Sequence, residues 1–188
     1  MKFLFYLFLI CTLASCTKYT GSAGTTNSIS SGYWKIAGVQ YNQVFCKRTV
    51  YNDNTGYLFA VDDTNKVKGE LSNSLIVSFN KMPTQNKTYN IKTFSSSQTS
   101  FPSDDSYVYV RLVTGAAYDS YGPYGATYAY QYLSASPVNN YDKLYVSINK
   151  GKINLNFSNA TMYKVQYILF NDSQLNETVS VEGNVKEN

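Results

Sequence analysis

From Gly32 onward, apolar and polar residues alternate along most of the chain, and this alternation constrains the fold more than any other feature. Successive side chains of a β-strand point to opposite faces, so a period of two predicts strands with one buried and one exposed face. No long stretch has the 3.6-residue period of an amphipathic helix. The sequence therefore predicts an all-β protein.

Gly, Asn, Asp and Pro residues separate the alternating segments, as expected for strands joined by turns. The clearest strands are 75–79, 107–113, 143–149, 152–157 and 163–170, and the weaker ones are 33–39, 44–51, 57–61, 88–93, 126–133 and 178–185. Between two of the clearest, Asn149 to Lys152 predicts a tight hairpin in which Gly151 tolerates positive φ. About ten short strands joined in this way predict a single antiparallel β-sandwich, with a closed β-barrel as the alternative.

The N-terminal residues have the features of a secretory signal. Lys2 supplies a positive charge, Phe3 to Leu13 form an apolar run too short to span a membrane, and small residues precede Cys16. The sequence Leu13-Ala14-Ser15-Cys16 resembles the bacterial lipobox, in which the cysteine thiol is acylated and the processed chain begins at that residue. This resemblance implies a signal peptide at residues 1–15 and a lipidation site at Cys16. The alternative is an ordinary secreted protein with a chance cysteine.

The rest of the chain divides into a tether and one domain. Residues 16–31 are rich in Thr, Ser, Gly and Asn and offer little to bury, which predicts a lipidated flexible tether. Residues 32–188 are then a single β domain. Several acyl chains on Cys16 would hold this domain durably at a membrane, because one chain alone binds only marginally.

Composition excludes several classes of function. The chain has no histidine, which excludes Ser-His-Asp and Cys-His catalysis, His-ligated zinc and a histidine pH switch. Its basic residues are scattered, and Lys47-Arg48 is the only adjacent pair, so nucleic-acid binding is not expected. Once Cys11 is removed and Cys16 is lipidated, Cys46 is the only thiol left and no intramolecular disulfide is possible.

Two family resemblances accompany these features. The start Gly32-Tyr33-Trp34 is similar to the Gly-x-Trp entry of lipocalins, which implies the closed-barrel alternative. More widely, the chain resembles small β-rich lipoproteins of Bacteroidota-type bacteria, through residues 34–41, 75–79 with Pro83 and Thr88-Tyr89, and 146–157 around Gly151-Lys152. That resemblance implies an outer-membrane location but no chemistry. Surface-exported members carry acidic residues after the lipidated cysteine, whereas Thr17-Lys18-Tyr19 follow here, which favours the periplasmic face.

Few residues are candidates for catalysis. Cys46 lies in an alternating segment with no histidine to activate it, so we expect it to pack as a small apolar side chain. The pairs Asp62-Asp63 and Asp104-Asp105 lie among turn residues, where Asp makes local hydrogen bonds, and a dedicated calcium loop is missing. We therefore expect no enzyme activity, no cofactor and no metal, and a carboxylate hydrolase is a distant alternative.

Tyrosines are the best candidates for ligand contact. The loop from Gly115 to Gly125 carries Tyr118, Tyr121 and Tyr124, whose rings can stack on sugars while their hydroxyls form hydrogen bonds. Other tyrosines fit half-buried strands and cross-strand pairs: Tyr107, Tyr109, Tyr128, Tyr130 and Tyr132. The sequence thus predicts a non-enzymatic envelope lipoprotein that presents loops to a glycan or a protein. The alternative is a lipocalin-like carrier of a small apolar ligand.

Overall fold

Eleven β-strands form the part of the chain that the computed structural model describes, residues 32–62, 71–94, 101–117, 129–135, 140–168 and 171–188. They are β1 (Tyr33–Ile36), β2 (Val39–Asn42), β3 (Phe45–Val50), β4 (Gly56–Val61), β5 (Leu71–Phe79), β6 (Lys87–Ile91), β7 (Tyr107–Ala117), β8 (Ala129–Ser134), β9 (Lys143–Asn149), β10 (Lys152–Ile168) and β11 (Asn171–Lys186). Every predicted strand overlaps an observed one, so the all-β prediction is confirmed.

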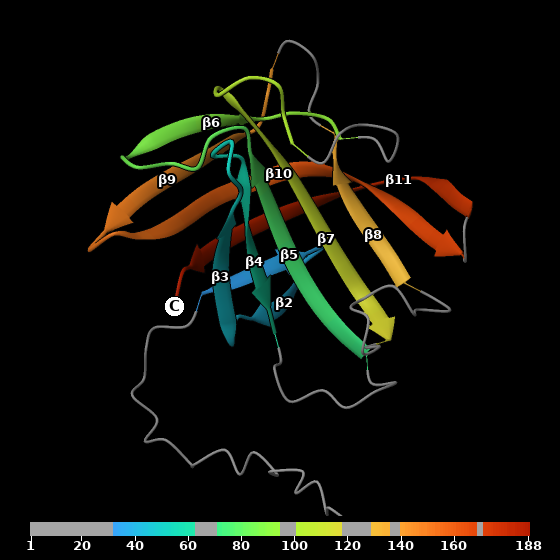
Figure 1. Cartoon of the computed structure of the whole chain (residues 1–188). Coiled ribbons are helices and arrows are strands. Elements are labelled where there is room, and N and C mark those ends of the chain that lie inside the picture. The colour runs from blue at the N-terminus through green and yellow to red at the C-terminus, as the bar shows by residue number, and fades with distance from the viewer. Residues whose placement is uncertain (1–31, 63–70, 95–100, 118–128, 136–139, 169–170) are drawn as a thin grey trace, which may run out of the picture.

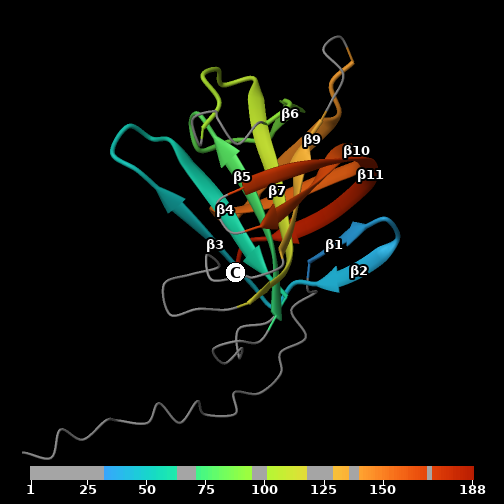
Figure 2. The ribbon, with the colours of Figure 1, turned by 90° about the vertical axis from the view of Figure 1, so that its right-hand side faces the viewer.

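The strands are hydrogen-bonded into one sheet rather than the two separate sheets expected of a sandwich. Their order is β2-β1-β11-β10-β9-β6-β7-β5-β4-β3, and β8 pairs with both β7 and β10. Pairing is antiparallel, as predicted, except between β6 and β7, which are parallel. Because long strands change neighbours along their length, the sheet passes from one layer to the other without a break and curls into a partial ring, as Figure 1 and the turned view in Figure 2 show.

A bulge joins two predicted strands into one. Segments 152–157 and 163–170 were expected to be separate, but both belong to β10. The register of β10 against β11 shifts between Phe157 and Ala160, and Asn159 has a φ of 53°. Such a bulge bends a strand and increases its twist. As a result, β10 pairs with β9 before the bend and with β8 after it.

Two tight turns with positive φ connect neighbouring strands. The predicted hairpin between β9 and β10 is confirmed, with φ of 51° at Lys150 and 77° at Gly151. A second hairpin joins β1 and β2 through Ala37 (φ 49°) and Gly38 (φ 84°), within a segment expected to be one strand. Alanine is uncommon at such a turn, so Gly38 was the only residue in this part of the sequence that indicated a hairpin.

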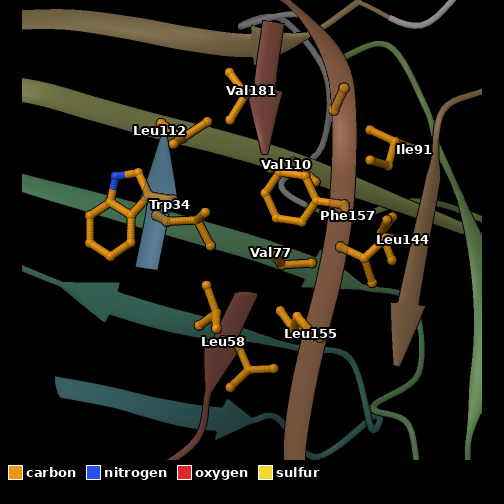
Figure 3. Packing of buried hydrophobic residues seen from close by; sticks show 14 of the residues in the cluster. Trp34, Leu58, Val77, Ile91, Val110, Leu112, Leu144, Leu155, Phe157 and Val181 are labelled. Carbon is orange, nitrogen blue, oxygen red and sulfur yellow. The ribbon is translucent and has the colours of Figure 1, made fainter. Parts of the chain in front are cut away.

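The inward side chains of the ring form one apolar cluster. Figure 3 shows Trp34, Phe157 and aliphatic residues from β4, β5, β6, β7, β9 and β11 pointing toward one another. Packing is close at Gly183 of β11, where an added Cβ would lie 2.6 Å from the ring of Phe157. Large side chains therefore fill the space between the two layers.

Polar contacts cover the edge of β3, the last strand of the sheet. The backbone N–H of Asn188 donates to the Cys46 carbonyl at 3.0 Å, and Asn188 Oδ1 accepts from the Cys46 N–H at 2.8 Å. Glu187 accepts hydrogen bonds from Arg48 Nε at 2.7 Å and from the Ile153 N–H at 2.8 Å. We call Glu187 and Asn188 the C-terminal clasp, because they join β3 to β10 where no strand ladder does.

Candidate ligand-binding site

Several residues singled out from the sequence lie outside the described part of the chain. These are the expected lipidation residue Cys16, the loop residues Tyr118, Tyr121 and Tyr124, and the expected strand residue Tyr128. Their roles stay predictions. The candidate site described here is made of other residues.

The described members of the two aspartate pairs make structural hydrogen bonds. Asp104 Oδ1 accepts from the Ser106 N–H at 2.6 Å, and this bond lowers the pKa of the Asp104 carboxyl. Asp62 accepts from the side-chain amide of Asn73 at 2.5 Å and from its backbone N–H at 3.1 Å. The local turn role is confirmed for Asp104, whereas Asp62 bonds across to β5, and Asp63 lies outside the described residues.

Cys46 is a buried, unreactive thiol. Its side chain is 1% exposed. Burial raises its pKa to about 12, with a further contribution from the negative charge of Glu187. Because the thiolate is the nucleophilic form of cysteine, this group stays protonated and inert near neutral pH. The prediction that Cys46 packs as a small apolar residue is confirmed.

Three strand tyrosines have structural roles, as predicted. Tyr109 and Tyr132 are buried. Tyr109 packs with its ring 5.0 Å from Phe94, and Tyr107 lies edge-on to Tyr141 at 5.3 Å. Their ring partners come from outside the strands, so these contacts are not the cross-strand pairs that the alternation suggested.

Two adjoining hollows lie at one end of the partial ring, where β3 and β5 end and β4, β6 and β7 begin (Figure 1). The first, which we call the mouth hollow, has a volume of about 510 Å³ and is lined by Arg48, Val50, Asn54, Lys81, Met82, Pro83, Thr84, Gln85, Lys87, Tyr89 and Asp105. The second, the turn hollow, has a volume of about 540 Å³ and is lined by Val50, Tyr51, Asn52, Asp53, Thr55 and Phe101. Val50 lines both, so the two hollows adjoin at this residue.

Strand geometry places the side chains of the mouth hollow. Arg48 and Val50 share the inward face of β3 because residues two apart point the same way. On β6, Tyr89 turns inward and is 3% exposed, with its ring edge-on to Phe79 at 5.3 Å. Burial raises the pKa of Tyr89 to about 12, and the charge of Asp105 adds to the shift. Its hydroxyl therefore stays neutral at physiological pH.

Three cations and one carboxylate line the mouth hollow. Lys81 Nζ lies 3.1 Å from Asp105 Oδ2, and its hydrogen bond lowers the pKa of Asp105. Lys87 Nζ donates to the backbone oxygen of Asp105 at 2.6 Å and lies 4.8 Å from the centre of the Tyr89 ring. Arg48 is paired with Glu187 of the clasp. The hollow can therefore attract and hold an anionic group.

Two aromatic rings, the exposed Tyr51 and the partly buried Phe101, line the turn hollow. Tyr51 is 47% exposed, and its ring centre lies 5.6 Å from that of Phe101 and 6.2 Å from that of Tyr57. Beside it, Asp53 accepts hydrogen bonds from the N–H of Thr55 at 3.0 Å and from its hydroxyl at 2.6 Å, which lower the pKa of Asp53. Apolar ring faces next to short polar side chains are suited to a ligand with C–H faces and hydroxyl edges.

Sequence reasoning did not find either hollow. The run Asn52 to Gly56 indicates only a turn, and Lys81 and Lys87 are two of the scattered basic residues. The available signal was a pair of tyrosines, Tyr51 and Tyr57, flanking a polar turn. Nothing in the pattern indicated that Phe101 would lie beside that turn.

Comparisons with known protein families, curated proteins and solved structures find no match to this chain. Within the described ranges, no helix is long and apolar enough to cross a membrane. The same residues contain no group of three or more Cys, Asp and Glu side chains arranged to hold a metal ion.

Proposed function

We propose that this chain is a non-enzymatic lipoprotein of the bacterial cell envelope that binds a glycan at the turn hollow. The observation that carries the proposal is the exposed ring of Tyr51, packed against Phe101 beside Asp53 and Asn52. Flat aromatic faces stack on sugar rings, and amide and carboxylate groups accept or donate hydrogen bonds to sugar hydroxyls. The sequence is compatible with either a glycan or a protein as the partner, and this chemistry favours the glycan.

Sequence features support the envelope location. The Leu13-Ala14-Ser15-Cys16 sequence places a lipid on Cys16, and residues 16–31 give the domain reach from the membrane. With Thr17-Lys18-Tyr19 after the lipidated cysteine, we place the protein on the periplasmic face of the outer membrane.

Chemical features support a binding role rather than catalysis. The chain has no histidine, and its Cys46 thiol is protonated and buried. Asp53 and Asp104 accept hydrogen bonds within their own turns. None of these groups resembles the activated base or nucleophile that hydrolysis needs.

The packing supports a layered, sandwich-like interior over an open lipocalin-like barrel. Trp34, Phe79 and Phe157 are fully buried within one cluster, together with many aliphatic residues. A carrier would need an interior cavity in that place.

One observation favours the second candidate function, a carrier of a small apolar ligand. Trp34 Nε1 is buried and, among the described residues, has no hydrogen-bond partner. A buried donor without an acceptor costs about 1–3 kcal/mol, and a ligand oxygen would remove that cost. Oleate titrated against the fluorescence of Trp34, the only tryptophan, checks this alternative; saturable quenching would support the carrier over the glycan-binding protein.

A glycan array tests the proposed function directly. We expect Tyr51→Ala to weaken binding about tenfold, because base stacking on aromatic side chains, an analogous contact, is worth roughly 1–3 kcal/mol per ring. The matched control is Tyr145→Ala, which removes a tyrosine that is 53% exposed on β9, away from both hollows. Equal binding by parent and Tyr51→Ala would contradict the proposal.

Two predictions concern residues outside the described ranges, and the array tests the first of them. Replacing Tyr118, Tyr121 and Tyr124 by Ala should weaken glycan binding if that loop also contacts the ligand. Cys16→Ser should move the protein from the detergent fraction to the soluble fraction, since the lipid would be lost. Unchanged partitioning would contradict the anchor.

A further inference from the structure

The mouth hollow carries more positive than negative charge. Lys81 and Asp105 form an ion pair at 3.1 Å, so their charges offset each other. Lys87 donates to the backbone oxygen of Asp105 and lies over the face of Tyr89, and its charge helps to lower the pKa of Asp104 and of Asp105. It forms no ion pair with any residue that the structure describes. Its charge is therefore available to a ligand.

Arg48 adds hydrogen-bond donors whose position is fixed, while Glu187 offsets its charge. Its Nε donates to Glu187 at 2.7 Å, and a terminal N–H group donates to the Gly151 carbonyl. The Glu187 side chain is only 9% exposed. A guanidinium fastened at two points presents its remaining donors in set directions, so a ligand need not first order a long side chain.

Apolar side chains line the mouth hollow together with these cations. Val50, Met82 and the buried Pro83 line the hollow, together with the ring of Tyr89. Cations beside apolar side chains match a sugar ring that carries an anionic substituent: the ring face packs on the apolar residues and the anion meets a cation.

The two hollows are placed to take neighbouring units of one ligand. They share Val50, and each volume, about 510 Å³ and about 540 Å³, lies within the range typical of small-ligand sites. In a glycan with one sugar stacked on Tyr51, the next sugar would therefore lie past Val50 in the mouth hollow, where Lys87 and Arg48 lie.

We propose that the mouth hollow binds an anionic sugar residue, so that the glycan recognised by this protein is acidic. The anion is a carboxylate or a phosphate, both of which accept charge-assisted hydrogen bonds from Lys and Arg. The inference rests on the proposed function, because the turn hollow must hold the neighbouring sugar.

The test compares acidic and neutral glycans on the full-length protein in detergent. Oligogalacturonate with neutral oligogalactoside probes a carboxylate, and phosphorylated oligomannose with plain oligomannose probes a phosphate. Lys87→Gln should weaken binding of an acidic glycan about tenfold and leave binding of the matching neutral glycan unchanged, since only the acidic glycan loses a charge-assisted hydrogen bond. Lys47→Gln is the matched control: it removes the same charge from an exposed outward position on β3.

The outcomes separate the inference from the proposed function. Loss with one acidic glycan only would support the inference and identify the anion. Equal affinity of the parent and Lys87→Gln for both acidic glycans would overturn it, as would an equal loss in Lys47→Gln, which would indicate general attraction. If Tyr51→Ala binds every glycan as the parent does, the proposed function itself fails. Equal thermal midpoints for the two lysine variants would show that a loss is not due to unfolding.

Discussion

The inward-facing residues of β10 and β3 differ in how far they are covered. On β10, Ile153, Leu155 and Phe157 are each at most 1% exposed. On β3, the row begins with Cys46 at 1% and ends with Val50 at 49%. β10 has strands on both sides, whereas β3 is the last strand and pairs only with β4. Alternation thus sets which way a side chain points, and neighbouring strands decide whether it becomes core or binding surface.

The largest effect expected from this contrast is on stability. Phe157→Ala should lower the free energy of unfolding by about 3–5 kcal/mol, because it leaves a cavity in a close-packed core. Val50→Ala, on the same kind of inward position, should cost less than about 0.5 kcal/mol because the residue is half exposed. Urea unfolding followed by Trp34 fluorescence measures both. Similar losses of unfolding free energy in the two variants would contradict the distinction between the core and the mouth hollow.

A second test uses the pH dependence of stability, to which Cys46 contributes as the buried inward residue of β3. The folded protein raises the pKa of Cys46 from 9.0 to about 12, so the unfolded chain releases this proton first as the pH rises. The contribution of the Cys46 thiol to the free energy of unfolding is complete below pH 9. It declines by roughly 1.4 kcal/mol per pH unit up to about pH 12. Cys46→Ala should show a shallower decline in this window. Parallel stability curves for parent and variant would mean that the thiol is not buried in this way.

The smallest of the three effects concerns the C-terminal clasp. Glu187→Ala should destabilise the fold by about 1–3 kcal/mol, because Arg48 and the Ile153 N–H lose their acceptor. The control is Glu182→Ala, which breaks a more exposed ion pair with Lys35 and should cost under about 1 kcal/mol. Thermal midpoints of both variants give the comparison. No difference between them would mean that the clasp does not support β3.

Much of the strand content could be predicted because inward and outward residues alternate so regularly. The hairpin at Lys150-Gly151 was also readable, since glycine is suited to positive φ. The turn at Ala37-Gly38 was not, because alanine gave no signal there. The single curled sheet was not readable either, since it depends on pairing between strands that lie far apart along the chain, such as β1 with β11 and β6 with β9.

The candidate site was hidden for a related reason. Val50 ends β3 and Tyr51 follows it, Lys87 begins β6, and Phe101 lies between β6 and β7. Separately, each residue has an ordinary role on a strand or in a turn. Only the arrangement of the strand ends at one end of the ring brings the aromatic rings beside the cations.

The bulge in β10 has a consequence for which deletions this chain can tolerate. Buried positions are odd-numbered from Ile153 to Phe157, become even at Ala160 and Met162, and are odd again at Val165. Deleting Asn156 would turn the following residues to the wrong face. Deleting Asn159 would instead bring the stretch that ends at Phe157 and the stretch from Ala160 to Met162 into one phase, keeping the core composition but straightening the bend. Loss of a single residue should therefore be better tolerated at the bulge than elsewhere in β10, and the change there would be one of shape.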